Sequence, residues 1–482
     1  MASTLPTPST DPQRERSLKL LLWLVAVGFF MQTLDATIVN TALPAMAASL
    51  GESPLRMQSV VVAYSLTMAM LIPASGWMAD RFGMRRVYVG AILLFVLGSV
   101  LCAMSHSLAL LVTARVVQGL GGALLLPVGR LVVLKTFPRE RFLQAMSFVA
   151  IPGLVGPLIG PTLGGWLVEV ASWHWIFLIN VPVGVVGALA TLRYMPRPAA
   201  AAVGRFDMAG YLLLAFGMVA LSLALDGLSG LGLRQASVLV LMIFGLASLA
   251  AYWLHALRRP DPLFSPSLFQ VGSLRIGLLG NLFSRLGSSC MPFLIPLLLQ
   301  VTMGYSPAQA GMMMLPVAIA SMSMKRLTTP LITRHGYRRV LVVNTLLVGL
   351  TMASFAFVSP DQPLVVRIVQ LALFGAVNSM QFTAMNTLTL KDLGPSAASS
   401  GNSLLSMVQM LAMGMGVAAA GAVLAAFAAF FGGEGVHTLS SFRATFATMA
   451  LITIASAGIF WQLDARDSAA TAARREQDVE AG

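Results

Sequence analysis

Charged residues are scarce in this chain of 482 residues. Asp, Glu, Lys and Arg make up 10% of it, against about 25% in a typical soluble domain, while 57% is hydrophobic. This balance excludes a soluble globular protein and indicates an all-α chain that crosses a lipid bilayer many times. The 31 basic residues outnumber the 18 acidic ones but are scattered over short loops, so we expect no nucleic-acid partner.

Cysteines and nucleotide-binding motifs are also lacking. Cys102 and Cys290 both fall in apolar segments, so neither a disulfide framework nor a metal cluster is expected. The five histidines show no ligand spacing, and no G-x-x-x-x-G-K-[ST] loop is present, which argues against direct drive by ATP. No Ser/His/Asp or Cys/His constellation occurs deep in the apolar segments. We therefore predict no cofactor, no metal and no enzymatic activity.

Fourteen segments are long and apolar enough to cross a bilayer, which takes about 20 residues. They lie near 19–42, 55–79, 87–105, 108–134, 142–169, 175–195, 208–226, 234–257, 273–300, 308–330, 339–358, 363–390, 397–431 and 441–463. With the amino terminus in the cytoplasm, 21 of the 31 Lys and Arg residues lie inside, and only Arg56, Arg234 and Arg443 lie outside. Both termini are therefore expected in the cytoplasm.

A short charged loop joins the second and third predicted spans. It reads Gly76-Trp77-Met78-Ala79-Asp80-Arg81-Phe82-Gly83-Met84-Arg85-Arg86. Such a tight turn must lie at a membrane surface, where Asp80 can pair with these arginines or with the positive end of a neighbouring helix. A positive-inside anchor would explain the arginines but neither glycine. The spacing G-x-x-x-D-R-x-G-x-R-R resembles the loop signature of the major facilitator superfamily, and it predicts a cytoplasmic gate made of Gly76, Asp80, Arg81, Gly83, Arg85 and Arg86.

Two short stretches repeat at almost the same offset. Residues 83–89 recur as 336–342, 253 residues later, and 115–118 recur as 367–370, 252 residues later. This repetition predicts two related halves of six helices, with two further spans between them. The predicted parts are a disordered cytoplasmic tail 1–18, a six-helix bundle 19–195, a linker with two inserted spans 196–260, a second bundle 261–463 and a cytoplasmic tail 464–482.

Asp35 is the one acidic residue that these boundaries place deep in a span. A carboxylate in hydrocarbon is unfavourable unless it is paired. Arg115 is the natural partner, because each residue lies about 7 positions, or roughly 10 Å, below the outer end of its own span. A structural ion pair and a proton carrier are both compatible with this pattern. The sequence around Arg115 resembles the fourth-span signature of proton-coupled facilitators, which implies proton coupling by Asp35 and Arg115.

The fifth span carries small residues at i, i+4 and i+8, which let helices approach closely, and a proline that bends the axis. These residues are Gly156, Gly160, Pro161, Gly164 and Gly165. Helix packing and gating are equally compatible with the bare pattern. The full spacing, however, resembles the antiporter signature of the superfamily, and residues 173–184 resemble the sixth-span start of its fourteen-span drug:proton antiporter branch. Residues 386–393 and 399–407 are similar to enterobacterial drug exporters of that branch.

The resemblance implies a monomeric antiporter in the inner membrane of a bacterium. Such a protein exports small molecules such as drugs by alternating access and is driven by the proton gradient.

The second half contains an arginine, Arg285, near the middle of the ninth span, and no acid in that half can neutralise it. The predicted substrate cavity consists of Arg285, Asn281, Gln118, Asn378, Asn386 and Asn402. Some of these side chains can equally serve as contacts between helices. A positive cavity suits an anion, whereas the resemblance implies many exporters of lipophilic cations. The alternatives are therefore a dedicated exporter of an organic anion or metal chelate, such as citrate or iron-citrate, and a sensor or scaffold that has lost transport.

Overall fold

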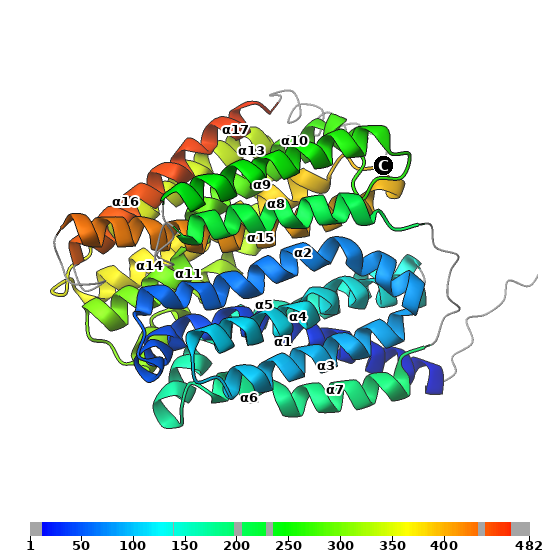
Figure 1. Cartoon of the computed structure of the whole chain (residues 1–482), viewed down its shortest axis with the longest axis horizontal. Helices are drawn as coiled ribbons and strands as arrows, with labels where there is room; N and C mark the ends of the chain where they lie inside the picture. Colours follow the sequence, from blue (N-terminus) through cyan, green and yellow to red (C-terminus); the bar gives the residue numbers. More distant parts are fainter. Residues whose placement is uncertain (1–11, 138, 197–204, 228–234, 432–438, 464–482) are drawn as a thin grey trace, which may run out of the picture.

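The computed structural model describes residues 12–137, 139–196, 205–227, 235–431 and 439–463, and within them the chain forms helices and no strand. Most of the long helices run along one common direction (Figure 1). The long helices are α1 (Pro12–Leu50), α2 (Gln58–Phe82), α3 (Met84–Ala103), α4 (Leu108–Thr136), α5 (Arg139–Val170), α7 (Asn180–Tyr194), α8 (Met208–Gly227), α9 (Gln235–Arg258), α10 (Gly272–Ser288), α13 (Leu315–Ser354), α14 (Leu364–Leu390), α15 (Pro395–Phe430) and α16 (Leu439–Ala455). Shorter pieces are η1 (Pro54–Met57), α6 (Trp175–Leu178), η2 (Pro266–Gln270), α11 (Met291–Leu297), η3 (Leu298–Thr302), α12 (Pro307–Met312), η4 (Phe355–Phe357) and α17 (Ala457–Trp461).

The helices end at two faces of the molecule. At the face called here the η1 end, α1 passes through η1 into α2; at the opposite face, the Gly83 end, α2 turns into α3 (Figure 1). Gly83 makes this turn with φ +88°, and Gly336 breaks α13 with φ +75°. Both values lie in a region that side chains disfavour and glycine tolerates. The two copies of the predicted repeat thus both begin with a glycine of positive φ.

Twelve helical segments of the described chain are long and apolar enough to cross a membrane. One of them, Pro307–Phe357, has 51 residues and contains two of the predicted spans, separated by the break at Gly336. Helix α5, with 32 residues and prolines at 152, 157 and 161, is not among the twelve. The chain is a multi-pass helical membrane protein.

Helix α1 begins earlier than expected. The tail predicted to be disordered through residue 18 is helical from Pro12 onwards, and residues 1–11 lie outside the described ranges. Proline is favoured in the first turn of a helix, where its missing N–H is not needed, and the residues that follow are good helix formers. The prediction of disorder was therefore wrong for residues 12–18.

The helices before α8 contact mainly one another, and so do the helices after α9. Helix α1 lies along α5, and α3 lies between α4 and α7; later in the chain, α13 lies along α14 and α16, and α10 contacts α14, α15 and α16. Helix α2 contacts α15, which joins the two sets, while α8 and α9 pair with each other and cover α2 and α15 through α8 (Figure 1).

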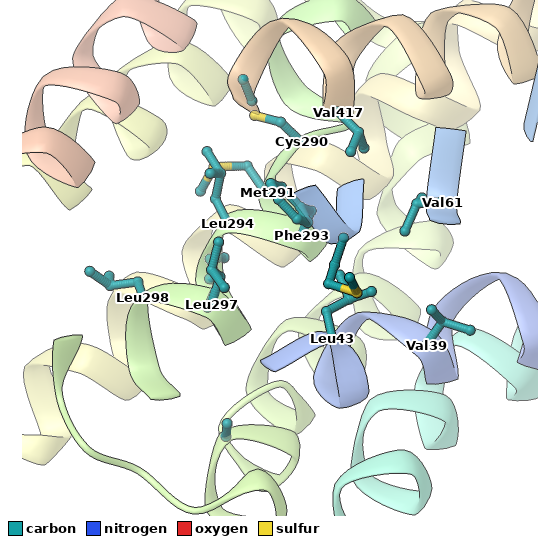
Figure 2. Close-up of a cluster of buried hydrophobic side chains, with 14 of the residues drawn as sticks. Val39, Leu43, Val61, Cys290, Met291, Phe293, Leu294, Leu297, Leu298 and Val417 are labelled. Atoms are coloured by element: carbon teal, nitrogen blue, oxygen red, sulfur yellow. The ribbon is translucent and has the colours of Figure 1, made fainter. Parts of the chain in front are cut away.

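A buried apolar cluster joins both sets of helices toward the η1 end. Val39 and Leu43 of α1, Val61 of α2, the segment α11–η3 and Val417 of α15 all contribute side chains to it (Figure 2). Within that segment Phe293, Leu294 and Leu297 are at most 1% exposed. Burial of this many apolar side chains holds the two sets together and excludes water from this end.

The pair α8–α9 is fastened at the Gly83 end by Asp207, which is 3% exposed. Its carboxylate lies 2.9 Å from His255 Nε2 and 3.4 Å from Arg259 Nε, and it accepts hydrogen bonds from the N–H groups of Gly210 and Leu263. Burial opposes ionisation of Asp207, but these hydrogen bonds outweigh it and lower the pKa of the carboxyl group. These side-chain contacts and backbone hydrogen bonds tie the start of α8 to the end of α9 and the segment after it.

Candidate functional site

Asp35 and Arg115 form a buried ion pair inside the first set of helices. Arg115 Nη1 lies 2.6 Å from Asp35 Oδ2, and the two side chains are 1% and 0% exposed. Asp35 comes from α1 and Arg115 from the first half of α4, so the contact predicted from their similar depth is present. The pair contributes no net charge to the hydrocarbon region, which is what makes its burial tolerable.

Two amides complete the hydrogen bonding of Asp35. Gln118 Nε2 donates to Asp35 Oδ1 at 2.7 Å, and Asn180 Nδ2, from the start of α7, donates to the same oxygen at 3.3 Å. Both amides also reach Ser99 Oγ of α3, at 2.9 and 3.5 Å. The carboxylate therefore accepts from a guanidinium and two amides that come from two different helices.

The other side of Arg115 is held by neutral groups. Its Nε donates to the carbonyl oxygen of Val60 at 3.2 Å, and its Nη1 donates to Gln118 Oε1 at 2.6 Å. The ring of Tyr64 lies 4.1 Å below the guanidinium, a favourable cation–π distance. Because Asp35 is the sole carboxylate bonded to Arg115 in the described chain, a proton added to Asp35 would leave the arginine charge uncompensated. Such a cluster can couple protonation to movement of its helices.

The fifth-helix glycines lie against α1. A Cβ atom added to Gly156 would come within 2.4 Å of Thr33 Oγ1, one on Gly160 within 2.3 Å of Thr37 Oγ1, and one on Gly164 within 2.5 Å of the carbonyl oxygen of Ile38. Any side chain here would have to push α5 away from α1. The expectation that these residues permit close helix approach is met by the geometry, and Asp35 lies on the stretch of α1 that they contact.

Helix α5 also packs against α12, one of the helices after α9, at the η1 end. A Cβ on Gly165 would lie 2.1 Å from the carbonyl oxygen of Pro307, and one on Gly311 would lie 2.4 Å from that of Pro161. Thr162 Oγ1 donates to the Gly311 carbonyl at 3.1 Å. Glu169 accepts hydrogen bonds from Ser306 Oγ at 3.0 Å and Ala308 N at 3.2 Å. These contacts close the η1 end on a second side.

The charged loop at the Gly83 end has a different ion pair from the one expected. Asp80 Oδ1 lies 2.7 Å from Lys135 Nζ, in the last turn of α4, with both side chains partly exposed. Arg81, Arg85 and Arg86 make no ion pair within the described residues. The expectation that Asp80 pairs with these arginines or with a helix amino terminus is wrong, because the end of the neighbouring α4 brings a lysine to the same surface.

The two loop glycines differ in what they do. Gly83 needs its missing side chain for the positive φ of the turn. A Cβ on Gly76 would instead meet no atom within 4 Å, so in this conformation no close contact requires glycine there.

Arg285 of α10 belongs to a second polar cluster. Its Nε donates to Asn281 Oδ1 at 3.1 Å, and its guanidinium lies 4.2 Å from the ring centre of Phe382. Gln409 connects Asn281 to Asn386, at 3.5 and 2.6 Å. Arg285 Nη2 is buried and lacks a hydrogen-bond partner, and in the described chain no carboxylate contacts this arginine. The cluster therefore carries one net positive charge.

The remaining residues of the predicted cavity are distributed differently. Gln118 lies in the Asp35 cluster, where both ends of its amide are used, and it is not exposed to a cavity. Asn378 and Asn402 are half-buried and make no hydrogen bond with other described residues. Of the six, Arg285, Asn281 and Asn386 come together.

A match to a known family classifies the chain. The family described as Major Facilitator Superfamily matches residues 25–417, which is most of the chain. The chain belongs to the major facilitator superfamily. Membership supports a membrane transporter for small molecules rather than an enzyme.

Curated relatives in enterobacteria are similar over nearly the full chain. The "Putative multidrug resistance protein MdtD" of Serratia proteamaculans is 55% identical over 412 residues, covering 86% of this chain and 86% of its own. The protein of the same name from Pectobacterium atrosepticum is 51% identical over 445 residues, covering 92% and 95%. The resemblance to enterobacterial exporters of the superfamily is confirmed.

Solved structures share the fold at low sequence identity. A POT family transporter in complex with 5-aminolevulinic acid has a TM-score of 0.68 at 16% identity, covering 92% of this chain and 95% of that one. The human organic anion transporter MFSD10 has a TM-score of 0.59 at 16% identity, covering 92% and 99%. At these identities the likeness concerns the superfamily fold alone.

Several members of the Asp35 cluster were not predicted from the sequence. Ser99, Asn180 and Tyr64 lie on three helices other than those of the ion pair. Asn180 begins α7 within the stretch that resembles the antiporter branch, so that motif was a signal for it. Ser99 is isolated in an apolar run, and Tyr64 is one of several hydroxyl side chains in its segment, next to Ser65 and near Thr67. Nothing in their spacing separates Ser99 and Tyr64 from ordinary packing residues.

Proposed function

We propose that this superfamily member is a proton-coupled antiporter that exports small molecules, drugs among them, from the cytoplasm. The observation that carries the proposal is the buried Asp35–Arg115 pair, in which a titratable carboxylate is held by charge and hydrogen bonds from two other helices, α4 and α7. The name of the MdtD relatives, multidrug resistance protein, supports drugs as one substrate class. The driving force is the proton gradient, without a cofactor.

Coupling follows from the electrostatics of the pair. A proton that enters from outside neutralises Asp35 and weakens its hold on Arg115, whose charge then favours a different arrangement of α1 and α4. Arginine stays protonated throughout, so the carboxylate is the group that changes charge. Protonation thus favours the conformation that reloads substrate from the cytoplasm.

For the architecture we propose fourteen spans: two six-helix bundles, residues 19–195 and 261–463, with α8 and α9 inserted between them. Two observations support this number. Pro307–Phe357 counts as one of the twelve segments but contains two crossings, and the 32-residue α5 adds one more, which gives fourteen. The η1 end faces outward and the Gly83 end faces the cytoplasm, with both termini, in the inner membrane of a bacterium. The bias of Lys and Arg toward the Gly83 end supports this orientation. The protein acts as a monomer.

This topology predicts the accessibility of two loops. Cysteines at Arg205 and Asp261, which flank the inserted pair, should resist an impermeant thiol reagent added to intact cells. The matched control is Asp361→Cys, an exposed position at the η1 end that should react. Both native cysteines are buried and can remain. Labelling of Arg205→Cys or Asp261→Cys in intact cells would exclude the fourteen-span arrangement.

Alternating access requires the two bundles to open at one end while they close at the other. The apolar cluster of Figure 2 and the joint of α5 with α12 support a conformation closed toward the outside. The loop Gly76–Arg86 is the proposed gate on the cytoplasmic side, where the Asp80–Lys135 pair fastens α2 to α4.

The gate predicts that Asp80→Asn slows transport without reducing the amount of protein in the membrane. A partly exposed pair contributes about 0–1 kcal/mol, so its loss changes conformational populations by up to roughly fivefold and leaves the fold intact. Lys135→Gln should reproduce the effect, whereas Arg81→Gln, which breaks no ion pair among the described residues, should have less effect. Ethidium efflux from cells is the measurement, normalised to membrane protein. Normal efflux in Asp80→Asn would show that the loop only sets the orientation of the protein in the membrane and does not act as a gate.

A second candidate function is export of an organic anion or metal chelate, such as citrate or iron-citrate. It is favoured by Arg285, whose Nη2 is buried without a partner and which has no neighbouring carboxylate in the described chain. A scaffold or sensor without transport is less well supported, since the Asp35 cluster and the glycine contacts of α5 are intact.

Inside-out membrane vesicles test the proposal directly. Acidifying the vesicle interior should drive ethidium uptake in vesicles that contain the protein, and an uncoupler should abolish it. Control vesicles carry the chain with Asp35→Asn. Ethidium uptake that is absent, or that an uncoupler leaves unchanged, would contradict proton-coupled export of this cation. Citrate uptake in the same vesicles tests the second candidate, export of an organic anion.

A further inference from the structure

An apolar groove runs along the surface of the first bundle, between α1 and α7. Its volume is about 500 Å³. Its base is formed by Ile92 and Phe95 of α3 and Leu125 of α4, all of them core residues that are at most 5% exposed. Of the side chains that line it, only Trp23 and Tyr194 carry a polar atom. A groove of this composition accommodates hydrocarbon and does not hold ordered water.

The groove has the length of one leaflet of a bilayer. Along α1 it extends from Leu20 to Met31, which are 11 positions apart, or roughly 17 Å of helix. Half of the hydrocarbon core of a membrane is about 15 Å. One end therefore lies near the Gly83 face and the other near the middle of the membrane, where Met31 is one helical turn from Asp35.

The end near the Gly83 face is flanked by basic residues. Lys19 precedes Leu20 on α1, and Arg193 precedes Tyr194 on α7; both are exposed. Trp23 and Tyr194 are aromatic residues of the kind that lie at the level of lipid headgroups. Basic pockets between helices on the cytoplasmic side suit anionic headgroups, and each cation near the surface is worth about 1 kcal/mol.

We propose that the groove binds an anionic glycerophospholipid of the inner leaflet. One acyl chain lies in the groove, and the phosphate lies at Arg193 and Lys19. The inference rests on the proposed orientation, which puts the Gly83 end in the cytoplasm. The bound chain packs between α1 and α7, the helices that carry Asp35 and Asn180, and it thereby helps to keep that hydrogen bond formed.

The probe is phosphatidylglycerol, compared with phosphatidylcholine, in nanodiscs and after mild detergent extraction. Native mass spectrometry should find one phosphatidylglycerol retained per protein and little phosphatidylcholine. Gly187→Leu should abolish retention, because a Cβ at Gly187 points into the groove and meets only Ile92, at 3.9 Å, so the leucine fills the space without a clash. Gly90→Leu is the control, since a Cβ at Gly90 meets no atom within 4 Å and Gly90 does not line the groove.

The headgroup contact is tested separately, with a variant that leaves the groove intact. Arg193→Gln should lower the preference for phosphatidylglycerol by roughly fivefold, which corresponds to about 1 kcal/mol for one cation. Equal retention of the two lipids by the unmodified chain, or undiminished retention in Gly187→Leu, would overturn the proposal. Displacement of the lipid by ethidium at equal concentration would also overturn it, since the groove would then be a substrate site. Lipid retention is measured without transport, so failure here is distinct from failure of the antiport proposal.

Discussion

Asp35→Asn is expected to abolish proton-driven export. Asparagine keeps the size of the side chain but cannot change its charge, so Arg115 loses the one carboxylate that bonds to it in the described chain. We expect ethidium uptake into acidified inside-out vesicles to fall to the level of vesicles without the protein. Ethidium binding, measured by fluorescence on purified protein, should remain, since the side chains of Asp35 and Arg115 are buried against protein groups and present no surface to a substrate.

A control must separate loss of coupling from loss of folding. Asp35→Asn leaves Arg115 buried and unpaired, and removing one partner of a buried pair destabilises a protein by about 3–5 kcal/mol. The double variant Asp35→Asn, Arg115→Gln removes both charges and should recover most of that stability while remaining uncoupled. Restored proton-driven uptake in the double variant, or undiminished uptake with its normal pH dependence in Asp35→Asn, would assign coupling to other groups.

Arg285→Gln is expected to remove export of organic anions while sparing that of cations. The guanidinium holds Asn281 through Nε and stacks near Phe382, which leaves Nη2 without an acceptor among the described residues. A planar guanidinium can bind a carboxylate or phosphate through two hydrogen bonds at once. We therefore expect citrate uptake into inside-out vesicles to be lost in Arg285→Gln and ethidium uptake to be unchanged or increased.

Arg285→Lys sharpens the same test. Lysine keeps the positive charge but cannot bond Asn281 and present a planar pair of donors together, so citrate binding should weaken without being lost. Asn378→Ala is the matched control, because Asn378 lies half-buried on a neighbouring helix and makes no hydrogen bond in the described chain. Unchanged citrate handling in Arg285→Gln would exclude the anion candidate and leave the cation exporter.

The sequence alone determined the features that depend on local pattern. Apolar runs predicted the long helices because each crossing must satisfy its own backbone hydrogen bonds in lipid. The position of Asp35 and Arg115 within their runs predicted their common depth, and hence their contact. The glycine in the repeated loop predicted the turn at Gly83 and the break at Gly336, since a positive φ is a property of one residue.

Apart from the Asp35–Arg115 pair, tertiary structure decided which polar groups meet. Lys135 rather than an arginine reaches Asp80, and Gln118 bonds to Asp35 rather than facing a cavity. Ser99 and Asn180 join the same cluster from separate helices. The helical period fixes which residues share a face, but the rotation of each helix about its axis is set by packing against its neighbours. A single polar side chain in an apolar run therefore acquires its partner only when the helices are assembled.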